Sequence, residues 1–367
     1  MNASGNGCGL TKRESVMLQG MAILLMLHHH FFNDLSIYGG GLAFWNETWV
    51  LRFAWFGKIC VGIFAFVSGY GMRKVLEKKT CGGFYERLGR GYLICFRQAF
   101  GLLIKYWIIL TGFMIILFMT GRKAFVPEEF FRNFALLEYS YNGAHWYVGQ
   151  YLKMLFLLPL LDGLFQGSDE KKFRKNKEIF YGTLLAAGGV IIAVFLAIEK
   201  LRHFIPAFAE WMRVAFLLVF FVGWLMARFS VFEWVFRKMQ GWNRFIWLGM
   251  GILFCAGVMA ARMKLADSPA FAKLDFLFVP VLTLGILLIT RTWKVIPSLF
   301  FPLGTCSAYL WLTHLFLYDL TKELVMGWTK SHLAFYVLQV LFSLLVGGAC
   351  KGIEIVLRKT FQKKPQA

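Results

Sequence analysis

Close cysteine pairs are absent from this chain of 367 residues, and acidic residues and long polar segments are scarce. The seven cysteines are scattered, and none has the spacing of a metal-ligand or redox motif. We therefore expect neither a metal centre nor a disulfide framework. No tandem repeat is found, and no polar segment exceeds about 30 residues, which is too short for a soluble domain. These absences exclude a disulfide scaffold, a repeat array and an appended soluble domain.

Charged residues make up only 16% of the chain, whereas hydrophobic residues make up 58%, and the mean hydropathy is +0.59. The apolar residues come in blocks of about 18 to 25, which as helices are long enough to cross a hydrocarbon layer of about 30 Å. No small-residue cleavage site follows the first block, so we expect it to stay as a span. The sequence thus predicts an all-α integral membrane protein.

Ten blocks are assigned as spans, and they cover residues 15–33, 51–73, 92–119, 144–165, 179–198, 213–229, 244–262, 274–290, 297–319 and 332–352. If the N-terminus is cytoplasmic, the inside segments hold about twice as many Lys and Arg residues as the outside loops, which predicts that both termini are cytoplasmic. Residues 1–14 then form a cytoplasmic tail, 15–352 the transmembrane domain and 353–367 a basic cytoplasmic tail. We expect a multi-pass protein of the inner, cytoplasmic membrane of a bacterium.

The net charge of +20 would suggest a nucleic-acid partner in a soluble protein. In a membrane protein, topology-determining charges and attraction to anionic lipid explain most of it. The expected partner is therefore the lipid bilayer and not a nucleic acid. Two loops stand out: residues 168–178 form a solvated charge cluster, and 120–146 are predicted to carry a short helix that begins at Pro127.

Basic residues in and near the third block suggest an anionic ligand. Arg90, Arg97 and Lys105 are spaced by seven and eight residues, so they share a helix face that runs inward from the cytoplasmic side. Arg87 and Arg90 form an RxxR pair at the mouth of that helix. Arginine binds phosphate through parallel hydrogen bonds, and a low dielectric strengthens each contact. The pattern favours a ligand that carries phosphates; in the alternative interpretation, these residues are topology charges, are paired, or snorkel to the interface.

Three histidines from different spans are predicted to lie at one depth. His30 and His314 lie about 24 Å and 26 Å along outward-running helices, and His145 begins an inward-running span. All three fall in the outer third of the membrane, where an ionisable residue is a functional candidate. Asp34, Glu138 and Asp319 are close in sequence and are candidates to orient the rings. The alternative is that the histidines only pack or form hydrogen bonds.

The first block ends in three consecutive histidines, and the helical period separates their directions. Gln19 and His30 differ by eleven residues, which is three turns, so they share one face about 16 Å apart. His28 and His29 point about 160° and 100° away from His30. We therefore favour His30 as a general base and take His30, Gln19 and His29 as the catalytic candidates.

Five motifs in order resemble the membrane-bound acyltransferase 3 family, the O-acetylase type that modifies cell-envelope polysaccharides. They are LQGMAILLMLHHHFF (18–32), VGIFAFVSGYGM (61–72), ERLGR (86–90), AHWYVGQYL (144–152) and LGTCSAYLWLTHLFL (303–317). The family's first helix carries a basic residue, ten residues and then a histidine. Gln19 takes the basic position and His30 the histidine, so the missing charge weakens the activity or is supplied elsewhere, with Arg97 and Lys105 as the nearest candidates.

The resemblance implies an O-acyltransferase that moves an acyl group, which we expect to be acetyl, from cytoplasmic acyl-CoA to a hydroxyl of an extracytoplasmic or lipid-linked carbohydrate. It implies that Arg87 and Arg90 contact the CoA donor, and the spacing adds Arg97 and Lys105. Acceptor or supporting roles are expected for Ser68, Tyr70, His145, Trp146 and His314.

Two other interpretations stay open. A transporter or flippase of an anionic or lipid-linked glycan would use the basic stripe and the histidines as its path, although no internal repeat supports it. A catalytically weakened family member with a sensing or assembly role would account for Gln19. The sequence also leaves open the acceptor, the choice between direct transfer and a covalent relay, and the oligomeric state.

Overall fold

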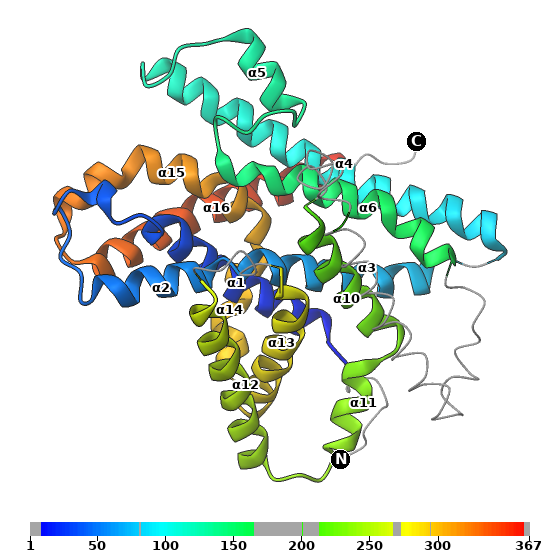
Figure 1. Ribbon diagram of the computed structural model, residues 1–367. Helices are drawn as coiled ribbons and strands as arrows, with labels where there is room; N and C mark the ends of the chain where they lie inside the picture. Colours follow the sequence, from blue (N-terminus) through cyan, green and yellow to red (C-terminus); the bar gives the residue numbers. More distant parts are fainter. Residues whose placement is uncertain are drawn as a thin grey trace.

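The computed structural model describes residues 9–80, 82–164, 200, 213–266, 273–293 and 295–362. Within these ranges the chain is helical and contains one isolated β-bridge and no strand. Figure 1 shows the helices, which are α1 (Lys12–Phe32), η1 (Ser36–Tyr38), α2 (Glu47–Gly57), α3 (Cys60–Lys79), α4 (Phe84–Met119), α5 (Pro127–Phe134), η2 (Gly143–His145), α6 (Trp146–Leu164), α10 (Val214–Arg228), α11 (Val231–Lys238), α12 (Arg244–Lys264), α13 (Asp275–Thr292), α14 (Val295–Thr305), α15 (Ser307–Trp328) and α16 (His332–Gln362).

Helix α1 lies at the centre of the bundle and contacts α2, α3, α14, α15 and α16 (Figure 1). A capping box begins it: the Glu14 backbone N–H donates to the Thr11 hydroxyl at 3.2 Å, and the Thr11 backbone N–H donates to the Glu14 carboxylate at 2.8 Å. Arg291 of α13 also donates to this carboxylate, at 2.6 Å. The first turn of α1 is therefore tied both to its own cap and to a distant helix.

Two glycines set the crossing of α1 with α14. A Cβ atom on Gly20 would lie 2.0 Å from the carbonyl oxygen of Phe300, and one on Gly304 would lie 1.7 Å from that of Val16. Both distances are impossible for a side-chain carbon, so the two backbones touch here, as small residues allow in membrane helices. Because Gln19 precedes Gly20, this contact sets the position of the Gln19 side chain.

A second pair of glycines sets the crossing of α3 with α10. A Cβ atom on Gly69 would lie 2.0 Å from the carbonyl oxygen of Phe220, and one on Gly223 would lie 2.1 Å from that of Phe66. The glycine of the Ser-Gly-Tyr motif is thus explained by helix packing. It also places the preceding residue, Ser68, on an adjoining face of α3.

The span predicted over 297–319 is not one unbroken helix, because the structure divides this segment into two helices that together are long and apolar enough for a span. Helices α14 and α15 meet at 66° around Cys306. Pro302 lies inside α14 and has no N–H with which to bond the preceding turn, which weakens the helix before the break. A similar bend of 58° separates α10 from α11. The break at Cys306 lets the first residues of α15 face a cavity.

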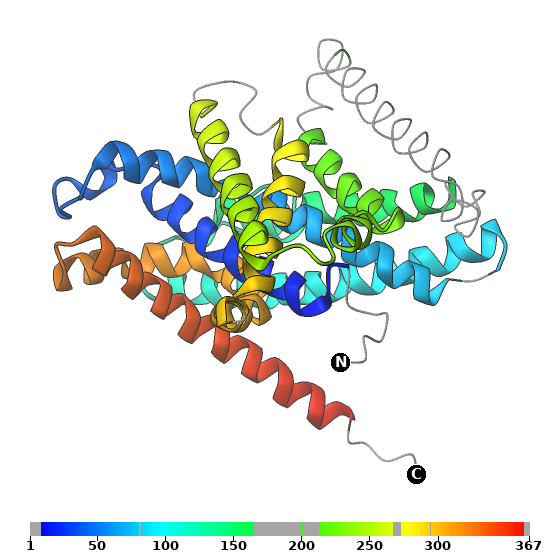
Figure 2. The same ribbon diagram turned by 90° about the horizontal axis from the view of Figure 1, so that it is seen from below.

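Within the described residues, six helices are long and apolar enough to cross a membrane, or up to eight if each bent pair is one span. The all-helical prediction is confirmed, and these helices indicate a multi-pass membrane protein. Ten spans and cytoplasmic termini stay predictions, and the predicted span 179–198 lies outside the described residues. Helix α5 begins at Pro127, as predicted. Helix α16 continues to Gln362, well past the predicted span end at 352, and Figure 2 shows it extending beyond its neighbours.

Candidate functional site

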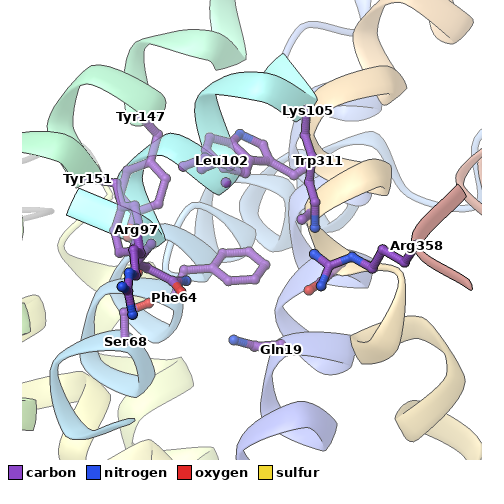
Figure 3. Close-up of a pocket in the computed structure, with 14 residues that line it drawn as sticks. Gln19, Phe64, Ser68, Arg97, Leu102, Lys105, Tyr147, Tyr151, Trp311 and Arg358 are labelled. Atoms are coloured by element: carbon purple, nitrogen blue, oxygen red, sulfur yellow. The ribbon is translucent and has the colours of Figure 1, made fainter. Parts of the chain in front are cut away.

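A cavity of about 290 Å³ lies among α1, α3, α4, α6, α15 and α16 (Figure 3). It unites Gln19 and Ser68 from the first two motifs with Arg97 and Lys105 from the basic stripe, so residues that the sequence singled out separately share one space. The complete lining is Gln19, Phe64, Ser68, Arg97, Gln98, Gly101, Leu102, Lys105, Tyr147, Tyr151, Ser307, Ala308, Trp311 and Arg358.

Three basic side chains reach this cavity: Arg97 and Lys105 from α4, and Arg358 from α16 (Figure 3). Glu354 contacts two of them, with Lys105 Nζ at 3.3 Å and Arg358 Nη2 at 2.7 Å. The Tyr309 hydroxyl donates to the same carboxylate at 2.6 Å. Because one acid faces three bases, these groups carry an excess of positive charge that suits an anion.

The RxxR pair lies nearer the start of α4 and does not line the cavity. Arg90 forms an ion pair with Glu86, one turn earlier, at 2.6 Å. Arg97 follows Arg90 by about 10 Å along the helix axis. Helix α4 is about 54 Å long, so its two ends cannot both lie in a hydrocarbon layer of about 30 Å. The RxxR pair and the cavity bases are therefore successive positions along one helix and not a single cluster.

His30 lies beside His314 near the opposite end of α1 from Gln19, and the two ring centroids are 4.9 Å apart. His314 is fully buried, and its Nδ1 lies 2.7 Å from the carbonyl oxygen of Trp311. A carbonyl only accepts, so Nδ1 donates and the neutral ring keeps a lone pair on Nε2. Among the described residues, His314 Nε2 has no hydrogen-bond partner. This pair can therefore accept a proton.

The other two histidines of α1 both contact α2. His29 Nδ1 donates to the carbonyl oxygen of Ala54 at 2.9 Å. His28 packs between Phe53 and Tyr336, with centroid distances of 4.9 and 5.5 Å. The His29 ring also contacts the His30 ring, with centroids 5.0 Å apart, so His29 adjoins the pair although its Nδ1 is held by α2. Within the described ranges, no group of three or more His, Cys, Asp or Glu side chains could hold a metal ion.

His145 and Trp146 lie outside the cavity lining, where His145 ends η2 and Trp146 begins α6. His145 is buried and its Nε2 donates to the carbonyl oxygen of Leu312 at 3.0 Å. The Trp311 indole donates in return to the carbonyl oxygen of Ala144 at 3.2 Å. These two bonds dock the start of α6 onto α15, so His145 has a structural contact in this arrangement.

The other candidate residues, Tyr70, Asp34 and Asp319, do not line the cavity. Tyr70 is buried away from the cavity, where its hydroxyl lies 3.4 Å from a Glu233 oxygen. Asp34 is exposed, and it accepts the Ser36 hydroxyl at 2.6 Å, which together with the Ser36 N–H holds the Asp34 pKa below its usual value. Neither Asp34 nor Asp319 forms a hydrogen bond to a histidine in the described part of the chain. Backbone carbonyls orient the rings of His145 and His314 instead.

Two features escaped the sequence analysis. Glu354 and Arg358 lie past the predicted end of the last span and were assigned to a basic tail, although their i, i+4 spacing is a signal for a helical ion pair. The second feature is the buried pair of Arg262 and Asp275, at 2.8 Å with both side chains 0% exposed. Arg262 also donates to two carbonyls of α2 at 3.0 Å, and it thereby holds α12 and α13 against α2.

The cavity and the histidine pair both draw residues from α1 and α15. The chain matches the family model described as an acyltransferase domain, Acyl_transf_3, over residues 17–350. It therefore belongs to the acyltransferase 3 family, as its motifs predicted, and the family indicates acyltransferase activity. No match is found among curated proteins or among solved structures.

Proposed function

We propose that the protein is an O-acyltransferase that moves an acetyl group from acyl-CoA to a hydroxyl of an extracytoplasmic glycan. The observation that carries this proposal is that α1 and α15 both connect the basic cavity with the histidine pair. Helix α1 contributes Gln19 to the cavity and His30 to the pair, and α15 contributes Ser307 to the cavity and His314 to the pair. A donor with phosphates at one end and a thioester at the other suits such a two-ended site.

The donor phosphates bind at the basic end in this proposal. Arg97 and Lys105 supply charge there, and Arg87 and Arg90 attract the donor at the mouth of α4. The first residues of α15 also line the cavity, and no side chain caps that helix. The start of α15 therefore adds the partial positive charge of a helix N-terminus. Gln19 lies about 16 Å from His30 along α1, so it contacts the donor and not the reacting carbonyl.

The reaction takes place at the histidine end. His30 accepts the proton of the acceptor hydroxyl while the hydroxyl oxygen bonds to the thioester carbonyl carbon. The carbon–sulfur bond then breaks, and the CoA thiolate takes up the proton that His30 holds. His314, whose ring contacts His30 and whose Nε2 has no hydrogen-bond partner, is a neighbour that can share this proton. The products are an acyl ester and free CoA.

The test uses the purified full-length chain in lipid nanodiscs with radiolabelled acetyl-CoA. We expect slow hydrolysis of the thioester and faster release of CoA when the acceptor is present. The acceptor is identified by mass spectrometry of envelope acyl esters in cells with and without the protein. Absence of both hydrolysis and transfer, together with a cellular phenotype that survives His30→Ala, would refute the enzyme and favour transport.

A further inference from the structure

We propose that Arg358 supplies the positive charge that position 19 lacks, and that it binds a phosphate of the donor. The assignment rests on the proposed acyl-CoA donor. Gln19 and Arg358 come from opposite ends of the chain, yet both line the cavity. Figure 3 shows both side chains directed toward the middle of that space.

Gln19 cannot supply a positive charge to a phosphate, because its amide is neutral. It offers only a dipole, whereas an arginine offers a full charge and five donors. The basic residues of α4 do not replace the positive charge that position 19 lacks. Lys105 is paired with Glu354 at 3.3 Å, so without Arg358 the acid cancels Lys105 and leaves Arg97 to face an anion. Arg358 restores a second uncompensated charge, as a phosphate monoester with a charge of about −2 requires.

The geometry of Arg358 suits a ligand. Its Nε and Nη2 atoms contact one oxygen of Glu354, at 3.0 and 2.7 Å, which holds the guanidinium plane. Nη1 forms no hydrogen bond to any described residue, so its donors are open. The side chain is 67% exposed and therefore accessible to a donor. Glu354, itself held by Tyr309 and Lys105, acts as the positioning residue for the guanidinium.

Glu354 and Arg358 both lie beyond residues 17–350, the range that the family model matches. They are brought to the cavity because α16 runs on to Gln362 as one helix. The compensating charge thus comes from outside the matched segment and reaches Gln19 only through tertiary packing.

The experiment measures binding of CoA to the full-length chain in nanodiscs by calorimetry, with Arg358→Ala, Arg358→Lys and the double variant Gln19→Arg with Arg358→Ala. Loss of a charged hydrogen bond weakens binding about 10-fold or more, so Arg358→Ala raises the Kd by that factor. Arg358→Lys keeps the charge but loses the forked donors of the guanidinium, so its Kd should lie between those of the wild type and Arg358→Ala. The Kd of the double variant should lie within about 3-fold of the wild-type Kd. Lys359→Ala, the exposed neighbour on the same helix, is the matched control and leaves the Kd unchanged.

Two failures are distinguishable. If the wild type binds CoA and Arg358→Ala binds it equally well, the assignment of Arg358 is wrong, but the proposed acyl-CoA donor is not contradicted. The same conclusion follows if Arg358→Ala weakens CoA binding and adding Gln19→Arg restores none of the lost affinity. If the wild type does not bind CoA, the proposed function fails and the assignment fails with it. A thermal unfolding curve for each variant identifies any that does not fold. If Arg358→Ala does not fold, Arg358→Lys decides the question, because an unchanged Kd in that variant would contradict a forked phosphate contact.

Discussion

The basic cavity and the histidine pair lie at different positions along α1, and their ionisable side chains differ in burial and in their partners. In the cavity, Lys105 and Arg358 are partly open to solvent and are paired with the Glu354 carboxylate. At the other end His314 is fully buried, and a backbone carbonyl instead of an acid orients its ring. Because a buried unpaired charge is costly, the histidine end favours neutral rings. One end is thus suited to hold an anion and the other to move a proton.

Substitution of His30 should have the largest effect on activity. His30→Ala should lower the rate of acyl transfer about 100- to 10,000-fold, because the proton acceptor is lost. The Kd for CoA should not change, since His30 does not line the basic cavity. His28→Ala is the control, because His28 packs against aromatic rings and not against His314. Equal losses in both variants would contradict the assignment of His30.

The buried ion pair beside the histidine end gives the next largest effect. Arg262→Ala leaves the fully buried Asp275 carboxylate without this partner, and we expect a loss of about 3 kcal/mol in the free energy of unfolding. Arg244→Ala, at the exposed start of the same helix, should change it by less than about 0.5 kcal/mol. Equilibrium unfolding curves in detergent measure both. Similar stabilities would show that the pair is not needed to hold α12 and α13 against α2.

At the basic end we expect a change in donor affinity and not in chemistry. Arg97→Ala should raise the KM for acyl-CoA about 10-fold with little change in kcat, because a lost binding contact affects KM alone. Arg87→Ala should have a smaller effect, since Arg87 does not line the cavity. Steady-state kinetics with varied acyl-CoA separate the two variants. A larger effect of Arg87→Ala would place the phosphates at the RxxR pair.

The smallest effect tests whether an acid assists the histidines. Ser36→Ala should raise the pKa of Asp34 toward its ordinary value, because the hydroxyl that stabilises the carboxylate is removed. In the wild type this stabilisation is present at neutral pH and is lost as the pH falls through the lowered pKa. Titration followed by carboxyl NMR measures the shift. Acyl transfer should be unchanged, and a clear loss of rate would mean that Asp34 does act on the histidines.

Part of the site could be predicted because it depends on one helix at a time. The eleven-residue spacing of Gln19 and His30 indicated their shared face, and the spacing of Arg97 and Lys105 indicated a basic side of α4. The sequence could not show that Arg358 faces Gln19, because the last helix continues past the point where hydropathy ends. It also missed the break at Cys306, since a window of apolar residues hides the effect of one proline.

The sequence by itself determined the helical membrane class, the separation of the histidine directions and the family. These follow from hydropathy, from the helical period and from short motifs, all of which act within a few turns of one helix. Only the tertiary structure decided that His30 meets His314, that Arg262 meets Asp275 and that a base from α16 joins the cavity. The physical reason is that helix pairs are selected where backbones can touch, as at Gly20 and Gly304, and no periodicity within one helix encodes its partner.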